Sequence, residues 1–270
     1  MIPAFKTGPN NFKEGQRIVT ELGASVCEVW FNVNKYAEYK EMFAWLQKHD
    51  VTFGLHHWGV VDGNIKTNLA TQDDHIRQET IRQIKQTIDI VVDEDAGSVN
   101  IHPGAECIET IDFTTGKQAI KENMRTKKEL AHKIFLESAH ELHEYAEDRN
   151  VLLTIESITA REKAIDSMRE PIYDPGSIPL SVIEQFVMEG GWFANDISHT
   201  ASHFLLSEEN TEAAWKPVVE FSKRIADRTK LVHMNVITPP YNGTDSHDGI
   251  TEEDFKQETF PEIVELIKKL

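Results

Sequence analysis

The chain has 270 residues and a formal net charge of −17 at neutral pH, with 40% hydrophobic and 27% charged residues. This composition is typical of a folded globular protein and excludes a disordered or fibrous chain. The negative charge disfavours binding to nucleic acid, and no run of about 18 apolar residues or secretory leader pattern is present, so we expect a cytoplasmic protein. Only Cys27 and Cys107 could form thiolate contacts, so any metal ion would be held by nitrogen and oxygen atoms.

Short β-type runs alternate with amphipathic helical segments almost from end to end, which is the pattern of parallel βα units. In chain order, the expected pairs of strand and helix are Ile2–Phe5 with Phe12–Leu22, Ser25–Phe31 with Tyr36–His49, Val51–Leu55 with Asp74–Val92, Ser98–Ile101 with Met124–Asp148, Val151–Ile155 with Leu180–Met188, Trp192–Asn195 with Thr211–Ala226, and Lys230–Met234 with Glu252–Leu270.

This pattern predicts an α/β fold, a TIM-type (β/α) barrel, with residues 1–270 forming one domain. A closed barrel needs eight strands, and the eighth is missing from the count. Three alternatives remain open: the barrel is incomplete, another chain or a rearranged element fills the position, or one strand has been overlooked. The second alternative is compatible with a homo-oligomer. Long loops at Val60–Gln72, Gly104–Glu122 and Thr159–Ser177 follow strands, so all three should lie on the active face.

Residues that can bind metal recur where the expected strands end, and a barrel would bring them to one mouth. They are His56 or His57, His102, Glu156, Asp196, His199, His233, and, in the loop beyond the last strand, Asp245 and His247. Such a mixture of imidazole and carboxylate suits zinc, manganese, cobalt or iron better than magnesium or calcium. We expect zinc or manganese, as one to three ions.

Each candidate also has a structural interpretation. Only one of the adjacent His56 and His57 can point inward, because side chains alternate along a strand. Asp196 could cap a helix and leave His199 on the surface. Glu156 closes an apolar strand, and a buried carboxylate without a partner is costly, so a metal ion or another cation is needed beside it.

Four aromatic residues could line a sugar pocket. Trp58 and Tyr241 are the preferred candidates for substrate binding, whereas core packing explains Trp30 and Trp192 at least as well.

Between about Val51 and Phe255, the sequence resembles the xylose isomerase-like TIM barrel superfamily, which includes sugar isomerases, sugar epimerases and the endonuclease IV group. The motifs that carry this resemblance occur in the superfamily's order: Asn100-Ile101-His102-Pro103-Gly104, Thr154-Ile155-Glu156-Ser157, Asn195-Asp196-Ile197-Ser198-His199, His233-Met234-Asn235 and Asp245-Ser246-His247-Asp248-Gly249.

The resemblance implies a set of metal ligands. His56, His102, Glu156, Asp196, His199, His233, Asp245 and His247 are similar to the ligands of a three-metal endonuclease IV site. The subset Glu156, Asp196 and His233 is similar to most of the single-metal site of keto-sugar epimerases. In both groups the last ligand is a glutamate on the eighth strand, which was not found in this sequence.

Departures from each group separate the alternatives. The endonucleases usually carry Asn-Thr-Ala-Gly after the glutamate and Asn-Asp-Ser-Lys after the histidine, where this chain has Ser157–Ala160 and Asn235–Thr238. No basic loops that would hold DNA are evident either. The Glu-x-Lys pair of true xylose isomerases is also missing, since Ile158 occupies the lysine position.

We therefore expect a metal-dependent isomerase or epimerase of a sugar or sugar derivative. Glu156 would be both a ligand and a proton acceptor, and His199 would bind or protonate a substrate oxygen, while His102, Asp245 and His247 would hold a second ion or orient the substrate. The second hypothesis is an endonuclease IV-like phosphodiesterase that repairs abasic sites. The third is a non-enzymatic barrel that keeps a metal ion only for structure or binds a partner through its open edge.

Overall fold

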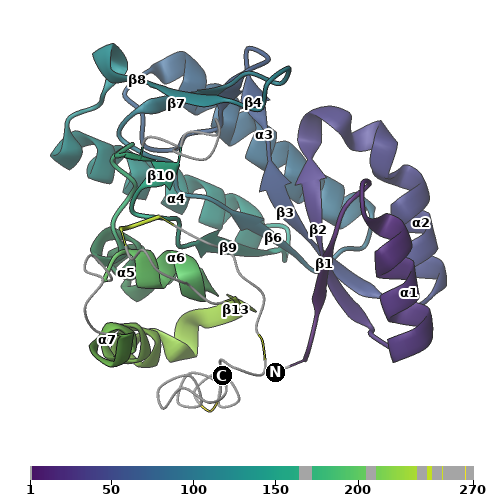
Figure 1. Ribbon diagram of the computed structural model, residues 1–270. Coiled ribbons are helices and arrows are strands. Elements are labelled where there is room, and N and C mark those ends of the chain that lie inside the picture. Colours follow the sequence, from purple (N-terminus) through teal and green to yellow (C-terminus); the bar gives the residue numbers. More distant parts are fainter. Residues whose placement is uncertain are drawn as a thin grey trace.

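Parallel strands form the main sheet of the computed structural model, which describes residues 2–163, 172–204, 211–235 and 242–244 together with Thr251 and Glu265 (Figure 1). Seven strands of this sheet are described, and their order in the sheet is their order along the chain. They are β1 (Phe5–Thr7), β2 (Val26–Asn32), β3 (Thr52–Trp58), β6 (Ser98–Ile101), β9 (Leu152–Glu156), β12 (Trp192–Asp196) and β13 (Thr229–His233). Each neighbouring pair is parallel.

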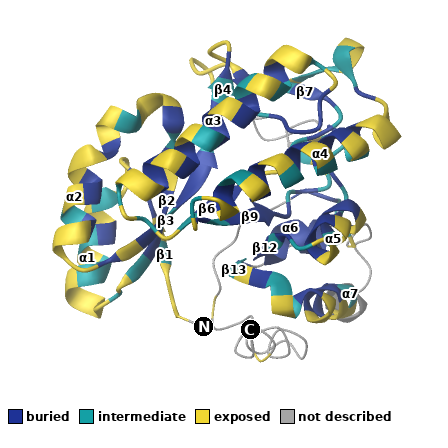
Figure 2. Ribbon diagram, turned by 180° about the vertical axis from the view of Figure 1, so that it is seen from behind, coloured by how far each residue is buried: buried dark blue, intermediate teal, exposed yellow. Residues whose placement is uncertain are grey.

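Helices connect successive strands and cover the outer face of the sheet (Figure 2). They are α1 (Phe12–Leu22), the 3₁₀ turn η1 (Val33–Tyr39), α2 (Lys40–Lys48), α3 (Asp74–Asp93), η2 (Glu122–Met124), α4 (Lys128–Glu147), α5 (Leu180–Met188), α6 (Ile197–Ser202), α7 (Thr211–Arg224) and η3 (Ala226–Arg228). Local signals set several ends. Asp73 caps α3 by accepting a hydrogen bond from the Ile76 amide, and Gly23 ends α1 in the left-handed conformation at φ +70°.

Alternation along the strands separates the core from the barrel interior. On β2, the side chains of Cys27, Val29 and Phe31 are buried in the hydrophobic core with residues of the surrounding helices. The core likewise takes Phe53 and Leu55 from β3, Val99 and Ile101 from β6, Leu153 and Ile155 from β9, and Phe193 from β12. The intervening residues therefore face the opposite side, and many of them are polar.

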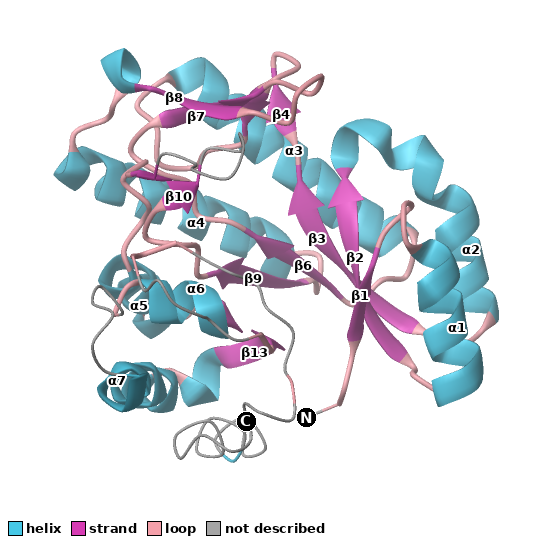
Figure 3. Ribbon diagram, in the orientation of Figure 1, coloured by secondary structure: helices cyan, strands magenta, loops and turns pink. Residues whose placement is uncertain are grey.

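Short antiparallel strands occupy the long segments that follow β3, β6 and β9 (Figure 3). The strands β4 (Val60–Val61), β5 (Ile65–Lys66), β7 (Ile108–Ile111) and β8 (Gln118–Lys121) form a four-stranded sheet, and β10 (Glu162–Lys163) pairs with β11 (Ile172–Tyr173). These segments were predicted as loops. The prediction of their position after the strands is confirmed, but hairpin pairing gives their backbone groups partners that an irregular loop would lack.

The predicted α/β barrel fold is confirmed: the main sheet curls, and seven of its strands lie within the described residues, which contain no eighth strand. The curl brings β13 back across the mouth to β2, where His233 Nε2 lies 2.9 Å from Glu28 Oε2. The predicted helix at Glu252–Leu270 lies outside the described residues, with the exception of Glu265. None of the described helices combines the length and the apolar character needed to span a membrane.

Candidate metal centre

Three strand-end residues that were predicted to share an ion are in contact at the barrel mouth. His233 Nδ1 lies 3.2 Å from Glu156 Oε1 and 3.4 Å from Asp196 Oδ2. These residues end β13, β9 and β12, which are adjacent in the sheet. Glu156 and Asp196 are each only 1% exposed, so both carboxylates are removed from water. The structure therefore brings these three side chains together at the barrel mouth.

The histidines on the neighbouring strands complete one side of the cluster. His56 Nε2 lies 3.2 Å from His102 Nε2, and His56 Nδ1 lies 3.6 Å from Glu156 Oε2. His102 Nε2 is also 3.7 Å from Glu156 Oε1. His57 points the other way, where its Nδ1 lies 2.8 Å from the Thr87 hydroxyl of α3. Strand alternation thus places His56 in the cluster and His57 against the helix layer.

Asp196 and His199 combine the two interpretations that the sequence allowed. Asp196 is the N-cap of α6, where its Oδ1 accepts a hydrogen bond from the His199 amide at 3.0 Å. Asn235 Nδ2 donates to the same carboxylate at 3.1 Å. His199 is buried rather than on the surface, and its Nδ1 donates to the Ser157 carbonyl at 2.6 Å and lies 3.4 Å from Glu156 Oε1. The cap therefore also positions both side chains in the cluster.

Glu28 belongs to this cluster, although the strand-end pattern did not identify it. Its carboxylate lies 2.9 Å from His233 Nε2 and 3.3 Å from His56 Nδ1. The Asn100 amide on β6 donates to Glu28 at 3.2 Å and also to Glu156, so it links the two carboxylates. Glu28 lies within β2 rather than at its end. A carboxylate inside an alternating apolar strand was the available signal, since it requires a buried partner.

The charges of the cluster are strongly coupled. Burial alone would raise the pKa of Glu28 and Glu156, but the neighbouring histidines, mainly His56 and His233, hold both carboxyl pKa values well below their usual range. Burial works against a proton on His233, yet Glu156 and the adjacent carboxylates raise its pKa to about 12. Burial lowers the pKa of His56 to about 4. Three buried carboxylates thus require positive charge among them.

The donor atoms fit a divalent cation. Three overlapping groups have ligand atoms within 4.8 Å of one another: Glu28, His56 and His233; His56, His102 and Glu156; and Glu156, Asp196 and His199. The facing nitrogens of His56 and His102 are 3.2 Å apart, a separation that either an N–H hydrogen bond or a shared cation accounts for. Carboxylate and imidazole donors together suit zinc or manganese.

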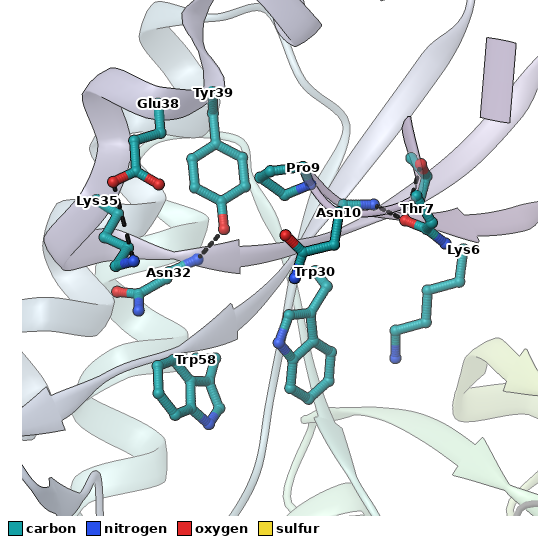
Figure 4. Close-up of a pocket in the computed structure, with 12 residues that line it drawn as sticks. Lys6, Thr7, Pro9, Asn10, Trp30, Asn32, Lys35, Glu38, Tyr39 and Trp58 are labelled. Carbon is teal, nitrogen blue, oxygen red and sulfur yellow. Dashed lines mark hydrogen bonds and ion pairs between the residues drawn. The ribbon is translucent and has the colours of Figure 1, made fainter. Parts of the chain in front are cut away.

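A pocket of about 520 Å³ opens beside the cluster at the ends of β1, β2 and β3 (Figure 4). Trp58, the candidate for substrate binding, lines this pocket, and so does Trp30. The core interpretation of Trp30 is wrong, because this residue is 38% exposed. The centroids of the Trp30 and His56 rings are 4.5 Å apart. Trp192 does not line the pocket, and the cations of Arg228 and Lys230 lie over its ring. The remaining predicted site residues, Tyr241, Asp245 and His247, lie outside the described residues.

Solved structures with the same fold include both epimerases and a nuclease. A D-tagatose 3-epimerase-like protein aligns over 98% of this chain and 86% of its own, with a TM-score of 0.63 and 17% identity. A 3-keto-D-glucoside 4-epimerase from E. coli aligns over 99% of this chain and 100% of its own, with a TM-score of 0.56 and 13% identity. Endonuclease IV from Thermus thermophilus aligns over 93% of this chain and 83% of its own, with a TM-score of 0.55 and 13% identity. At these identities the similarity establishes the fold alone.

Sequence comparison defines the family more directly. No curated protein matches this chain. The profile of the family described as xylose isomerase-like TIM barrel matches residues 16–170, more than half of the sequence, and this confirms the resemblance that its motifs indicated. The chain belongs to the xylose isomerase-like TIM barrel family.

Proposed function

We propose that this protein is a divalent-metal-dependent isomerase or epimerase acting on a sugar or sugar derivative. The observation that supports this most directly is a buried cluster of carboxylates and histidines next to a pocket walled by two indole rings. A pocket of this size accommodates a small molecule, and flat aromatic rings favour the apolar faces of sugars. Epimerases among the structural relatives agree with this assignment.

Glu156, Asp196 and His233 Nδ1 would hold the principal ion, and His102 and His199 would complete its site. The newly identified Glu28 would contribute a carboxylate on the side of His56 and His233 Nε2. Bound there, a divalent ion supplies a positive charge that polarises a substrate carbonyl and acidifies the neighbouring C–H bond. Glu156 is proposed as a proton acceptor as well as a ligand. His199 is proposed to bind or protonate a substrate oxygen, because its Nδ1–H bond to the Ser157 carbonyl orients the ring.

The second candidate is a metal-dependent phosphodiesterase like endonuclease IV. The overlap of three ligand groups favours it, because clustered ions are used to activate water and stabilise the departing oxygen. The proposed Asp245 and His247 ligands would enlarge that site. Against it stand the formal charge of −17 and the departures at Ser157–Ala160 and Asn235–Thr238.

Metal analysis and two activity assays separate these candidates. The purified protein is assayed for zinc, manganese, cobalt and iron, then tested for interconversion of ketoses and aldoses and for cleavage of a duplex with an abasic site. One exchangeable ion with sugar interconversion supports the isomerase. Two or three tightly bound zinc ions with duplex cleavage would replace it with the nuclease.

Substitution of Glu156 tests whether the site is catalytic at all. Glu156→Gln keeps the size of the side chain and removes its charge, so either enzyme should lose activity by at least about 100-fold. Glu144→Gln on the exposed side of α4 is the matched control and should retain full activity. Full turnover in Glu156→Gln would refute the catalytic role of Glu156, and a wild-type protein without turnover in either assay would leave only the third hypothesis, a non-catalytic barrel.

A further inference from the structure

The pocket beside the metal centre has two chemically distinct walls. Its aromatic wall consists of Trp30 and Trp58, which point to the same side of the sheet (Figure 4). Parallel pairing explains this arrangement, because Asn32 is the register partner of Trp58 and Trp30 is the partner of His56. The rings therefore continue the inner face that carries the metal-binding side chains. A ligand lying on them would extend directly from the cluster.

Lys6 on β1 forms the boundary between the cluster and the pocket. It is the register partner of Glu28, so both side chains face the barrel interior. Its ammonium lies 3.2 Å from Glu28 Oε2, 2.9 Å from His56 Nδ1 and 4.8 Å from the centre of the Trp30 ring. The side chain remains 40% exposed and lines the pocket. The cation is thus held in place while still accessible to a ligand.

The charge around Lys6 favours an anionic ligand. Glu28 does not neutralise Lys6 alone, because the same carboxylate also contacts His233, His56 and Asn100. A second cation, Lys35, lines the pocket, and its contact with exposed Glu38 is long at 3.9 Å. Such exposed pairs are weak. In a chain with a net charge of −17, the pocket is a local exception that carries two lysines and one glutamate.

We propose that the pocket selects sugar derivatives that carry a carboxylate or phosphate group, and that Lys6 forms the ion pair with this group while the sugar lies on Trp30 and Trp58. The inference rests on the proposed function, since it assumes that the substrate reaches the metal centre through this pocket. It adds a substrate class and a specificity-determining residue. A charge-assisted contact at a partly buried ammonium should favour the anionic ligand by roughly tenfold or more.

Calorimetric titration of the full chain tests this directly. The probes are D-fructose, D-fructose 6-phosphate, D-glucuronate and inorganic phosphate at constant ionic strength, with and without Mn²⁺. At least one anionic sugar should bind about tenfold more tightly than D-fructose and than inorganic phosphate. The phosphate and carboxylate arms then identify which anion is preferred. Equal affinity for D-fructose and both anionic sugars, or binding of inorganic phosphate alone, would overturn the proposal.

Variants assign the preference to Lys6. Lys6→Met should lower the ratio of the affinity for the anionic sugar to the affinity for D-fructose by about tenfold, whereas Lys6→Arg should retain most of this ratio. Lys48→Met, which removes the same charge from the exposed end of α2, is the control. A preference that persists in Lys6→Met refutes the role of Lys6. If Lys6→Met does not fold, the same affinities are measured for Lys6→Gln, and the comparison of anionic and neutral sugars in the wild-type protein still tests the preference itself.

The outcomes also separate this inference from the proposed function. Isomerisation of the same sugars is measured independently of binding. An anion preference without any turnover would refute the isomerase and support the pocket assignment. Turnover of neutral sugars without an anion preference would support the isomerase and refute the pocket assignment.

Discussion

Replacement of Glu28 by glutamine is the sharpest test of the candidate metal centre, because no strand-end pattern pointed to this residue. Glu28 is 7% exposed. Its carboxylate lies 3.3 Å from His56 Nδ1 and among three nitrogen donors: Lys6 at 3.2 Å, His233 at 2.9 Å and Asn100 at 3.2 Å. Glutamine fills the same volume but offers one acceptor oxygen and an NH₂ group. At least one of the three donors would then face another donor.

Two effects of different size follow. Loss of an anionic ligand should weaken metal binding by at least about 100-fold, which corresponds to about 2.7 kcal/mol. The free energy of unfolding should fall by about 2 to 3 kcal/mol, because hydrogen bonds to a charged group contribute about 1.5–3 kcal/mol each and part of this loss is offset by the easier burial of an amide. Metal binding should therefore be lost under conditions in which the variant still folds.

Metal affinity is measured by competition with a chelator, and stability by urea unfolding in the presence of excess chelator. Glu144→Gln serves as the control for both, since its exposed side chain lies on the outer helix layer. The reasoning fails if Glu28→Gln binds Mn²⁺ or Zn²⁺ within about threefold of the wild-type affinity. Weaker stability with unchanged metal binding would assign Glu28 a purely structural role.

Three further predictions concern the whole chain. Mn²⁺ or Zn²⁺ at about 100 times its dissociation constant should raise the free energy of unfolding by about 2.7 kcal/mol, and an unchanged melting temperature would contradict a native metal site. Burial raises the pKa of Cys27 to about 12 and that of Cys107 to about 11, so neither thiol should react with a disulfide reagent at pH 8 until the chain is unfolded; rapid native labelling would contradict this. Burial lowers the pKa of His143, whose Nδ1 has no hydrogen-bond partner among the described residues. The unfolded chain therefore takes up this proton more readily below about pH 6.5, and stability falls as the pH drops. His143→Leu should reduce that slope, by at most about 1.4 kcal/mol per pH unit, in urea unfolding between pH 5 and 7; equal slopes in the two proteins would exclude the effect.

Periodicity and strand-end polarity were sufficient to predict the barrel and most of the cluster. The helix ends at Phe12–Leu22 and Leu180–Met188 agree with the structure, as does the strand Ser98–Ile101, because turn residues and apolar periods mark them clearly. The choice between His56 and His57 required the strand register. Alternation alone shows that the two differ, but not which one faces the interior.

The residues that were missed share a physical reason. Lys6 and Glu28, and Trp30, which was named but not preferred, lie within the first two strands, where a single charged or aromatic side chain in an apolar run is compatible with an outer or an inner position. Their place becomes clear only when β1 and β2 are paired, since the register puts Lys6 opposite Glu28. The small sheet of β4, β5, β7 and β8 was missed because β4 and β5 are only two residues long and because its central pairing, β5 with β7, joins segments that are distant in sequence.

Glu28 also changes how the incomplete barrel should be understood. The family resemblance implied a last glutamate ligand on an eighth strand, and the described main sheet contains no such strand. The curl of the sheet nevertheless brings a carboxylate from β2 to 2.9 Å from His233 Nε2 on β13, with Asn100 holding that carboxylate next to Glu156. A third carboxylate of the cluster can thus come from β2, close to the opposite edge of the same sheet. If Glu28 performs this role, the metal centre needs no additional strand to balance its charge, and the open side of the barrel does not argue against catalysis.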